Sequence, residues 1–595
     1  MDDKKFFSQT IAKNYREELK CALQLQNYVA KIFEAAEACG FFELVGTATD
    51  AEEILTAGNS FFDKNYFGTR VLILAPHPDD EINIAGNMIL TLAAAKAEIF
   101  VAYSTNGDFE QKAEVRAQEA VDALKILGVP REKIIFLGYG DGHKLSDVPT
   151  KSPAGHVETY AAENFVDYAK KISGRHNSYT RKNFKHDLKN LLLELRANII
   201  FCVDFDNHAD HRTLSILFEE VLGEILSERS DYRPEVYKKF AYATAFTAAA
   251  DFYAPNLLST PKPKLGETDT YDFDFVDRGN YIWENRVRFP VMHSQTLLKG
   301  NPIAEAIFAH KSQRNEWNAL RIINSDEIFF ERRTDSQTFS AQITATSGDA
   351  IKVRDFKIID TDDVNAVPAL IKNNLWQPTD NLRKIFFKWS EAVQVRRIVI
   401  YGNPLDDMPA KISLRLEIDK AGISLDNVKN FSAELPNHGR PLVIDTEKIF
   451  VTRAEISAID AGKNFGLSEV EFFANTEPLR KIPPFIKLTI NDNFFYNYAV
   501  PNEVDKISVG LYRFHVDAPV KITATVGDEN ILSEVIDDEL ILNLGKATEI
   551  ILTAEVVGSD IYDRVIVRRV GDLAQIQLKV WQWLDKLRVH KLRNI

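Results

Sequence analysis

Residues 71–81 read VLILAPHPDDE, and they give the clearest signal of the fold class. Its first five residues are an unbroken apolar run, which is too short for a helix and lacks the polar alternation of a half-exposed strand. The run therefore predicts a strand buried on both faces of a sheet. The polar turn that follows leads into helical spacing at 81–96, so the stretch indicates the first strand and helix of an α/β domain.

The same alternation continues along the chain. Further apolar runs predict strands at 99–103, 134–138 and 199–203, and helical spacing predicts helices at 111–127 and 159–196. Strands that alternate with helices require right-handed crossovers, so we expect a doubly wound, Rossmann-like parallel sheet. A later helix is predicted at 302–322, with Pro302 at its first position.

Beyond about residue 335 the helical spacing ends and strand-sized runs alternate with turn residues. The clearest runs lie at 398–401, 413–418, 470–473, 486–490 and 522–526. This pattern is typical of β-sandwich modules. Three prolines in the segment 476–484 predict a linker between two such modules.

Composition narrows the class of protein. The chain has 595 residues, a length that implies about three to five domains. Its formal net charge of −14 gives no electrostatic footprint for nucleic acid, and no stretch approaches the roughly 18 apolar residues of a membrane helix. The three cysteines are widely spaced, and the N-terminus has no apolar secretory signal, so we expect a cytoplasmic protein without a disulfide framework.

A polar segment follows each of the four predicted strands. The segments are residues 76–81, 105–108, 140–143 and 206–211. Ligands of open α/β sheets bind outside the carboxyl ends of the strands. We therefore expect these four segments to form one polar cluster.

The first and last segments contain a candidate metal site. His77, Asp80 and His211 offer two imidazole nitrogens and one carboxylate, the donor set that suits Zn²⁺ with an open position for water. The same set also accepts Fe²⁺ or Co²⁺.

The neighbouring residues supply candidate catalytic groups. Asp79 is positioned as a general base for a water at the site. His208 is the candidate donor to a developing oxyanion, and Asp210 is the candidate carboxylate that holds an imidazole in its tautomer and charge state. Together these groups predict an amide or ester hydrolase.

These segments resemble the PIG-L/LmbE-like family of zinc-dependent N-deacetylases, which remove acetyl groups from N-acetylglucosamine units. The resemblance covers about residues 69–325 and rests on LAPHPDDE at 74–81, STNGD at 104–108, Arg116-x-x-Glu119, FLGYGDG at 136–142 and NHADHR at 207–212. It implies zinc ligation by His77, Asp80 and His211. It also implies that Asp79 is the general base and that His208 stabilises the tetrahedral intermediate.

The resemblance further implies that Arg116 and Asp141 hold sugar or phosphate oxygens of the substrate. His310 lies in a segment similar to the family's late His-x-Ser-Gln and is assigned a supporting contact near the substrate. Two alternatives stay open: Arg116 is also explained as a helix charge paired with a glutamate, and His310 as a structural histidine. Insertions at 143–190 and 251–295 exceed those of a minimal member and leave the leaving sugar undefined.

We expect five regions in the chain. They are an N-terminal helical region at 1–68, the PIG-L/LmbE-like deacetylase domain at 69–330, a β-sandwich at 335–476, a second, Ig-like sandwich at 484–570 and an amphipathic helix at 571–595. The first sandwich resembles the galactose-binding-like (discoidin or coagulation-factor type C) domain on residues 370–376, 397–402 and 466–472. The basic final helix is interpreted either as docked on the protein or as a peripheral contact with the inner membrane face.

The expected function is metal-dependent removal of the N-acetyl group from an N-acetylglucosamine-type amino sugar in a glycan or glycoconjugate. One alternative keeps the chemistry and changes the substrate to another N-acyl amide, such as a thiol-sugar conjugate or an antibiotic. A second alternative is a catalytically inactive glycan-binding scaffold. No nucleic-acid partner and no transmembrane segment are expected.

Overall fold

The structure is a computed structural model, and it describes most of the chain after residue 65. The described residues are 66–142, 146, 148–204, 208–239, 241, 286–289, 302–313, 327–358, 361–363, 370–371, 375–403, 408–419, 428–437, 441–476, 485–490, 497–514, 516–536, 539–559 and 561–571. The predicted helices within 1–68 and 571–595 lie outside these residues, as does the insertion at 251–295 apart from 286–289.

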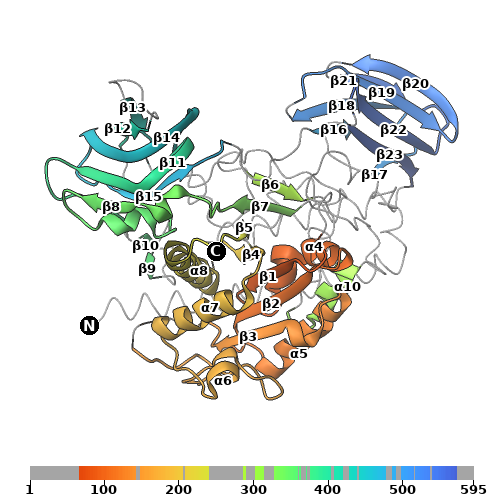
Figure 1. Cartoon of the computed structure of the whole chain (residues 1–595). Coiled ribbons are helices and arrows are strands. Elements are labelled where there is room, and N and C mark those ends of the chain that lie inside the picture. The colour runs from red at the N-terminus through yellow and green to blue at the C-terminus, as the bar shows by residue number, and fades with distance from the viewer. Residues whose placement is uncertain are drawn as a thin grey trace, which may run out of the picture.

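A seven-stranded sheet in the order β3-β2-β1-β4-β5-β7-β6 forms the centre of the N-terminal domain (Figure 1). Its strands are β1 (Arg70–Ala75), β2 (Glu98–Thr105), β3 (Ile134–Tyr139), β4 (Ile199–Val203), β5 (Glu235–Lys239), β6 (Arg286–Phe289) and β7 (Glu327–Glu331). The first five are parallel, and β7 and β6 add an antiparallel edge. The parallel α/β fold predicted from the apolar runs is therefore confirmed.

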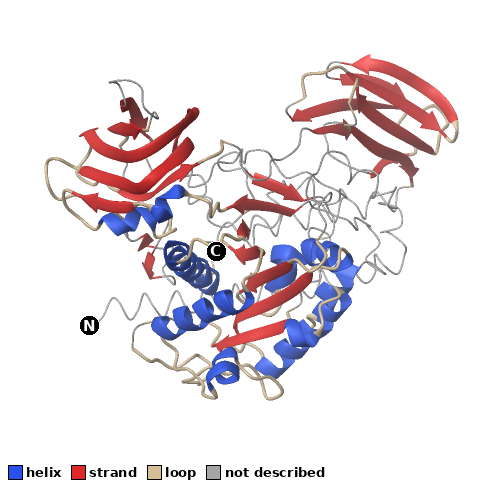
Figure 2. Ribbon diagram, viewed as in Figure 1, coloured by secondary structure: helices blue, strands red, loops and turns tan. Residues whose placement is uncertain are grey.

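Helices cover both sides of this sheet (Figure 2). The helices are α4 (Asp80–Ala94), α5 (Ala113–Ile126), α6 (Tyr168–Ser173), α7 (Arg181–Leu195), α8 (Ala209–Glu228) and α10 (Pro302–Ala309). In Figure 2, α4, α5 and α10 lie on one side, with α7 and α8 on the other. Helix α10 packs against α4 and α5, although it follows them by more than a hundred residues of chain.

Two helix predictions were wrong in extent. The region 159–196 is not continuously helical, because Gly174 ends α6 in the left-handed conformation and α7 begins only after its cap at Thr180. The helix predicted at 302–322 ends at Ala309, and the chain turns at 310–313.

The strand order creates a topological switch beside β1. The chain moves outward from β1 to β2 and β3, then returns to pair β4 with the other edge of β1. Open α/β sheets bind ligands in the crevice at such a switch point. The segments after β1 and β4 therefore meet where a ligand is expected.

Two β-rich modules follow. The first contains β8 (Gln342–Ala345), β11 (Lys384–Gly402), β12 (Ala410–Ile418), β13 (Val428–Leu435), β14 (Pro441–Asp460) and β15 (Leu467–Phe473), with the separate pair β9 (Thr361–Asp363) and β10 (Leu370–Ile371). Its core includes the fully buried Trp376.

The second module packs two sheets on one apolar core. One sheet has the order β16-β18-β21 and the other β17-β23-β22-β19-β20. The strands are β16 (Phe485–Ile490), β17 (Asn497–Pro501), β18 (Lys506–Phe514), β19 (Val520–Val526), β20 (Glu529–Ile536), β21 (Glu539–Asn543), β22 (Glu549–Val556) and β23 (Tyr562–Val570). The strand runs predicted from the sequence all fall within strands of these two modules.

The first β module packs directly on α8 of the parallel-sheet domain. The backbone of the buried Phe356 accepts a hydrogen bond from Arg332 Nη2 at 2.9 Å and donates one to Glu469 Oε2 at 3.0 Å. A Cβ placed on Gly223, in the middle of α8, would lie 2.3 Å from the carbonyl oxygen of Asp355. Helix α8 therefore contacts this module closely. None of the described helices combines the length and apolarity needed to cross a membrane.

Candidate active site

The three predicted metal ligands come from the two sides of the switch point. His77 follows β1, Asp80 is the first residue of α4, and His211 lies in the first turn of α8. Asp80 Oδ2 lies 2.9 Å from His77 Nδ1 and 3.1 Å from His211 Nε2. The structure thus brings all three side chains together around one carboxylate oxygen, and all three are buried.

The other ring nitrogen of His77 faces two further carboxylates. His77 Nε2 lies 3.2 Å from Asp141 Oδ1 and 3.2 Å from Asp210 Oδ2. The backbone also fixes this second group, since Asp210 accepts a hydrogen bond from the Gly142 N–H at 2.9 Å. The polar segments after β1, β3 and β4 therefore converge, as expected for strand ends of one parallel sheet.

These groups form a strongly anionic surrounding for His77. Burial lowers its pKa, but the carboxylates of Asp141, Asp210 and Asp80 outweigh this effect and hold the pKa well above 6.5. Burial alone would raise the pKa of Asp80. The nearby His211 outweighs this effect, so the pKa of Asp80 lies well below its usual range. Several carboxylates around one site favour positive charge there.

The donor set fits a divalent metal ion. Potential ligand atoms of His77, His208 and His211 lie within 4.8 Å of one another, and so do those of His77, Asp141 and Asp210. Imidazole nitrogens and carboxylate oxygens together suit Zn²⁺ and also accept Fe²⁺ or Co²⁺. Asp80 belongs to neither group, so ligation by His77, Asp80 and His211 stays a prediction, as does the identity of the metal.

Asp79 lies next to this cluster in an unusual backbone conformation. It precedes α4 with φ 151° and ψ −26°, and its carboxylate makes no hydrogen bond to its own helix. Arg116 Nη2 lies 3.0 Å from Asp79 Oδ1 instead. Burial raises the pKa of Asp79, and Arg116 opposes that rise. A raised pKa brings a carboxylate closer to the range useful for a general base.

Arg116 binds the turn that carries Asp79. Its Nη2 and Nε donate to the carbonyl oxygen of Pro78 at 2.7 and 3.2 Å, and the residue is only 5% exposed. Asp141, the other predicted substrate contact, is also buried and borders His77. Their roles toward a substrate stay predictions.

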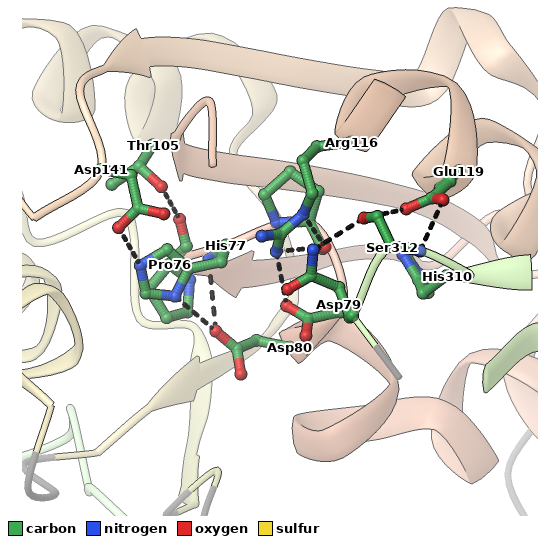
Figure 3. A network of polar contacts seen from close by, with 12 residues as sticks. Pro76, His77, Asp79, Asp80, Thr105, Arg116, Glu119, Asp141, His310 and Ser312 are labelled. Atoms are coloured by element: carbon green, nitrogen blue, oxygen red, sulfur yellow. Dashed lines mark hydrogen bonds and ion pairs between the residues drawn. The ribbon is translucent and has the colours of Figure 1, made fainter. Parts of the chain in front are cut away.

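His310 is almost fully buried, and its role toward a substrate stays a prediction. It is 1% exposed, and its Nε2 lies 2.7 Å from Glu81 Oε1. Two residues further along, Ser312 donates to Glu119 of α5 from both its backbone nitrogen and its hydroxyl, at 2.8 and 2.6 Å. Figure 3 shows Arg116 reaching the turn that carries Asp79, and Ser312 in contact with Glu119 nearby.

Glu81 and Asp108 are the residues that the sequence analysis did not assign. Glu81 is fully buried and accepts the Asp79 N–H at 2.8 Å. Asp108 accepts the Asp141 N–H at 3.0 Å and so fixes the segment after β3. The sequence pointed to these two residues through their positions in the motifs at 74–81 and 104–108.

His208 is the most open member of the cluster. It is the cap residue of α8, where its Nδ1 accepts the Asp210 N–H at 3.3 Å. Its side chain is 34% exposed, whereas those of His77 and His211 are 8% and 0% exposed. Its ring lies 4.8 Å from that of His77 and 4.7 Å from that of His211. This placement leaves one face of the cluster reachable through His208.

The fold and the site define an α/β protein with a histidine and aspartate centre at the switch point of a parallel sheet. The family model described as PIG-L, GlcNAc-PI de-N-acetylase, matches residues 72–222, so this part of the chain is a PIG-L domain.

Among curated proteins, the N-acetylglucosaminyl-phosphatidylinositol de-N-acetylase of Bos taurus is 29% identical over 70 residues. The match spans 12% of this chain and only 28% of the length of that relative.

Two solved structures resemble this chain over a share of its length. The N,N'-diacetylchitobiose deacetylase from Pyrococcus horikoshii, complexed with its inhibitor, aligns with 49% of this chain and 95% of its own, at 16% identity and a TM-score of 0.26. The family 32 CBM from C. perfringens NanJ, in complex with galactose, aligns with 22% of this chain and 93% of its own, at 14% identity and a TM-score of 0.17.

Proposed function

We propose that this protein is a metal-dependent hydrolase that removes the N-acetyl group from an N-acetylglucosamine-type amino sugar in a glycan or glycoconjugate. The observation that carries the proposal is the meeting of His77, Asp80 and His211 beside Asp79, within the segment that matches the PIG-L family model. A cytoplasmic location is part of the same proposal.

His77, Asp80 and His211 would hold the metal. When bound, a divalent ion supplies a Lewis acid for the amide carbonyl and lowers the pKa of a nearby water. Asp79 takes the proton from the attacking water, since its raised pKa favours acceptance of a proton more than that of an exposed aspartate. The same carboxyl group then returns the proton to the leaving amine.

His208 and Asp210 support this chemistry from the other side. His208 is the exposed donor that can approach the carbonyl oxygen as negative charge develops on it. Asp210 lies 3.2 Å from His77 Nε2 and 3.8 Å from His208 Nδ1, so its carboxylate lies beside both rings and helps to hold their orientation. Arg116 holds the Asp79 carboxylate in place through Nη2.

Acetate release tests the proposal. Zinc-loaded protein is incubated with N-acetylhexosamine monomers, oligomers, nucleotide sugars and lipid-linked sugars, and the metal content of each sample is measured. Asp79→Asn should abolish release while the metal is retained. Asp231→Asn is the matched control, because Asp231 is an exposed aspartate of the same domain that pairs with Arg229, and its loss should leave release unchanged.

Two results would contradict the proposal. One is absence of acetate release across the whole panel from protein that carries one metal ion per chain. The other is equal release by wild type and Asp79→Asn.

A further inference from the structure

The peptide unit between Pro78 and Asp79 is held at both of its polar ends. Arg116 donates to its carbonyl oxygen, that of Pro78, at 2.7 Å. Glu81 Oε2 accepts its N–H, that of Asp79, at 2.8 Å. Because one peptide plane contains both groups, the two contacts together fix how that plane is oriented.

This orientation is one that the local sequence does not favour. Asp79 has φ 151°, a backbone value that residues with a side chain rarely adopt. Such conformations persist when the surrounding structure holds them, and they cluster at functional sites. An aspartate before a helix usually accepts an N–H of that helix, but Asp79 makes no such bond. The backbone therefore directs this carboxylate away from its helix.

Glu81 needs a partner of its own to serve as an acceptor. It is fully buried, and a buried carboxylate is costly unless it is paired. His310 supplies that partner at 2.7 Å, from a position 229 residues later in the chain. His310 is fixed in turn, because α10 packs on α4 and α5 and Ser312 anchors the following turn to Glu119.

We infer that Glu81 and His310 are positioning residues, which hold the Pro78–Asp79 peptide so that the Asp79 carboxylate stays turned away from its own helix and in contact with Arg116. This inference rests on the proposed function for its effect on turnover, but the orientation of the peptide is a property of the chain itself. His310 contacts Glu81, and Glu81 in turn accepts the Asp79 N–H.

Hydrogen exchange tests the backbone part without any substrate. Residues 76–80 contain only three backbone N–H groups, on His77, Asp79 and Asp80, because residues 76 and 78 are prolines. In His310→Ala we expect at least tenfold faster exchange of the Asp79 N–H, with exchange in β2 unchanged. His310→Gln places an amide donor near the same carboxylate and should restore slow exchange. Unchanged exchange at Asp79 in His310→Ala would overturn the inference whether or not the chain is a deacetylase.

Kinetics test the functional part on the best substrate of the acetate assay. A displacement of about 1 Å in a catalytic group can cost on the order of 100-fold. His310→Ala should therefore lower kcat about 10- to 100-fold with KM and metal content unchanged, and His310→Gln should recover most of kcat. His176→Ala is the matched control, because it removes a histidine–carboxylate contact of 2.6 Å to Asp167 in the same domain, and it should change kcat less than twofold.

The outcomes separate the two proposals. A wild-type protein that is inactive but shows the expected exchange pattern would overturn the proposed deacetylase activity. It would still support the positioning of the Pro78–Asp79 peptide by Glu81 and His310. An active wild type whose kcat is unaffected by His310→Ala would overturn the positioning role. Loss of metal, or faster exchange throughout β2, in His310→Ala would show a general structural role and would also overturn it.

Discussion

Gly223→Ala is a direct test of how α8 packs on the first β module. The added Cβ would lie 2.3 Å from Asp355 O, 2.7 Å from Asp355 C and 3.0 Å from Phe356 Cβ. Two of these atoms belong to backbone, so no side-chain rotation relieves the contact. Helix α8 and the segment at 355–356 would have to separate by at least about 0.7 Å, which a close-packed interface resists.

The size of the effect follows from two opposing contributions. Overpacking of this kind costs about 1–3 kcal/mol, whereas replacing a mid-helix glycine by alanine gains about 1 kcal/mol in helix propensity. Since backbone lies on both sides of the contact, we expect the upper part of the cost and a net loss of about 1–2 kcal/mol. For a unit of this size the thermal midpoint should fall by roughly 2–8 °C.

Thermal unfolding of the full chain, followed by circular dichroism, measures this shift. Ser227→Ala is the matched control, because Ser227 lies at an exposed position of α8. The substitution changes the helix propensity and leaves the packing of α8 unchanged. Its midpoint should stay within about 2 °C of wild type. If Gly223→Ala unfolds at or above the wild-type temperature, α8 does not approach Asp355 as closely as described.

Three further predictions concern the site and the interface. His208→Ala should lower kcat about 100- to 1000-fold with metal retained, and parallel loss of metal would argue against an oxyanion role. Burial raises the pKa of Glu471 to about 7 from 4.5, so the folded chain keeps a proton that the unfolded chain loses. The free energy of unfolding should therefore fall as the pH rises from about 4.5 to 7. Urea unfolding across this range should show a flatter pH dependence in Glu471→Gln, and an equal dependence would count against the burial argument. Chelation should lower the thermal midpoint and zinc should restore it, because a metal that binds only the folded state stabilises it; a midpoint insensitive to both treatments would contradict the metal site.

The sequence predicted the sheet well because buried parallel strands have a simple signal. The run at 199–203 coincides with β4, and the run at 71–75 differs from β1 by one residue. Once the strands were placed, the rule that ligands bind at their carboxyl ends brought His77 and His211 together. The local sequence was therefore sufficient to predict that these two histidines meet.

The contacts around Asp79 were not predictable in the same way. The hydrogen bond from Arg116 to Pro78 depends on how α5 is placed along its axis relative to the turn after β1. The contact between Glu81 and His310 joins residues 229 positions apart in the sequence. Periodicity and motif spacing carry no information on such distances. The break between α6 and α7 was missed because apolar spacing continued on both sides of Gly174.

The long separation between Glu81 and His310 also has a consequence for synthesis of the chain on the ribosome. At about 5–20 residues per second, the 229 residues between them take roughly 10–45 s to translate. During that interval β1 and α4 have left the ribosome while the histidine that pairs with Glu81 has not yet been made. The first strands of the nascent domain are therefore available well before His310 can pair with Glu81 and help to hold the turn at Asp79.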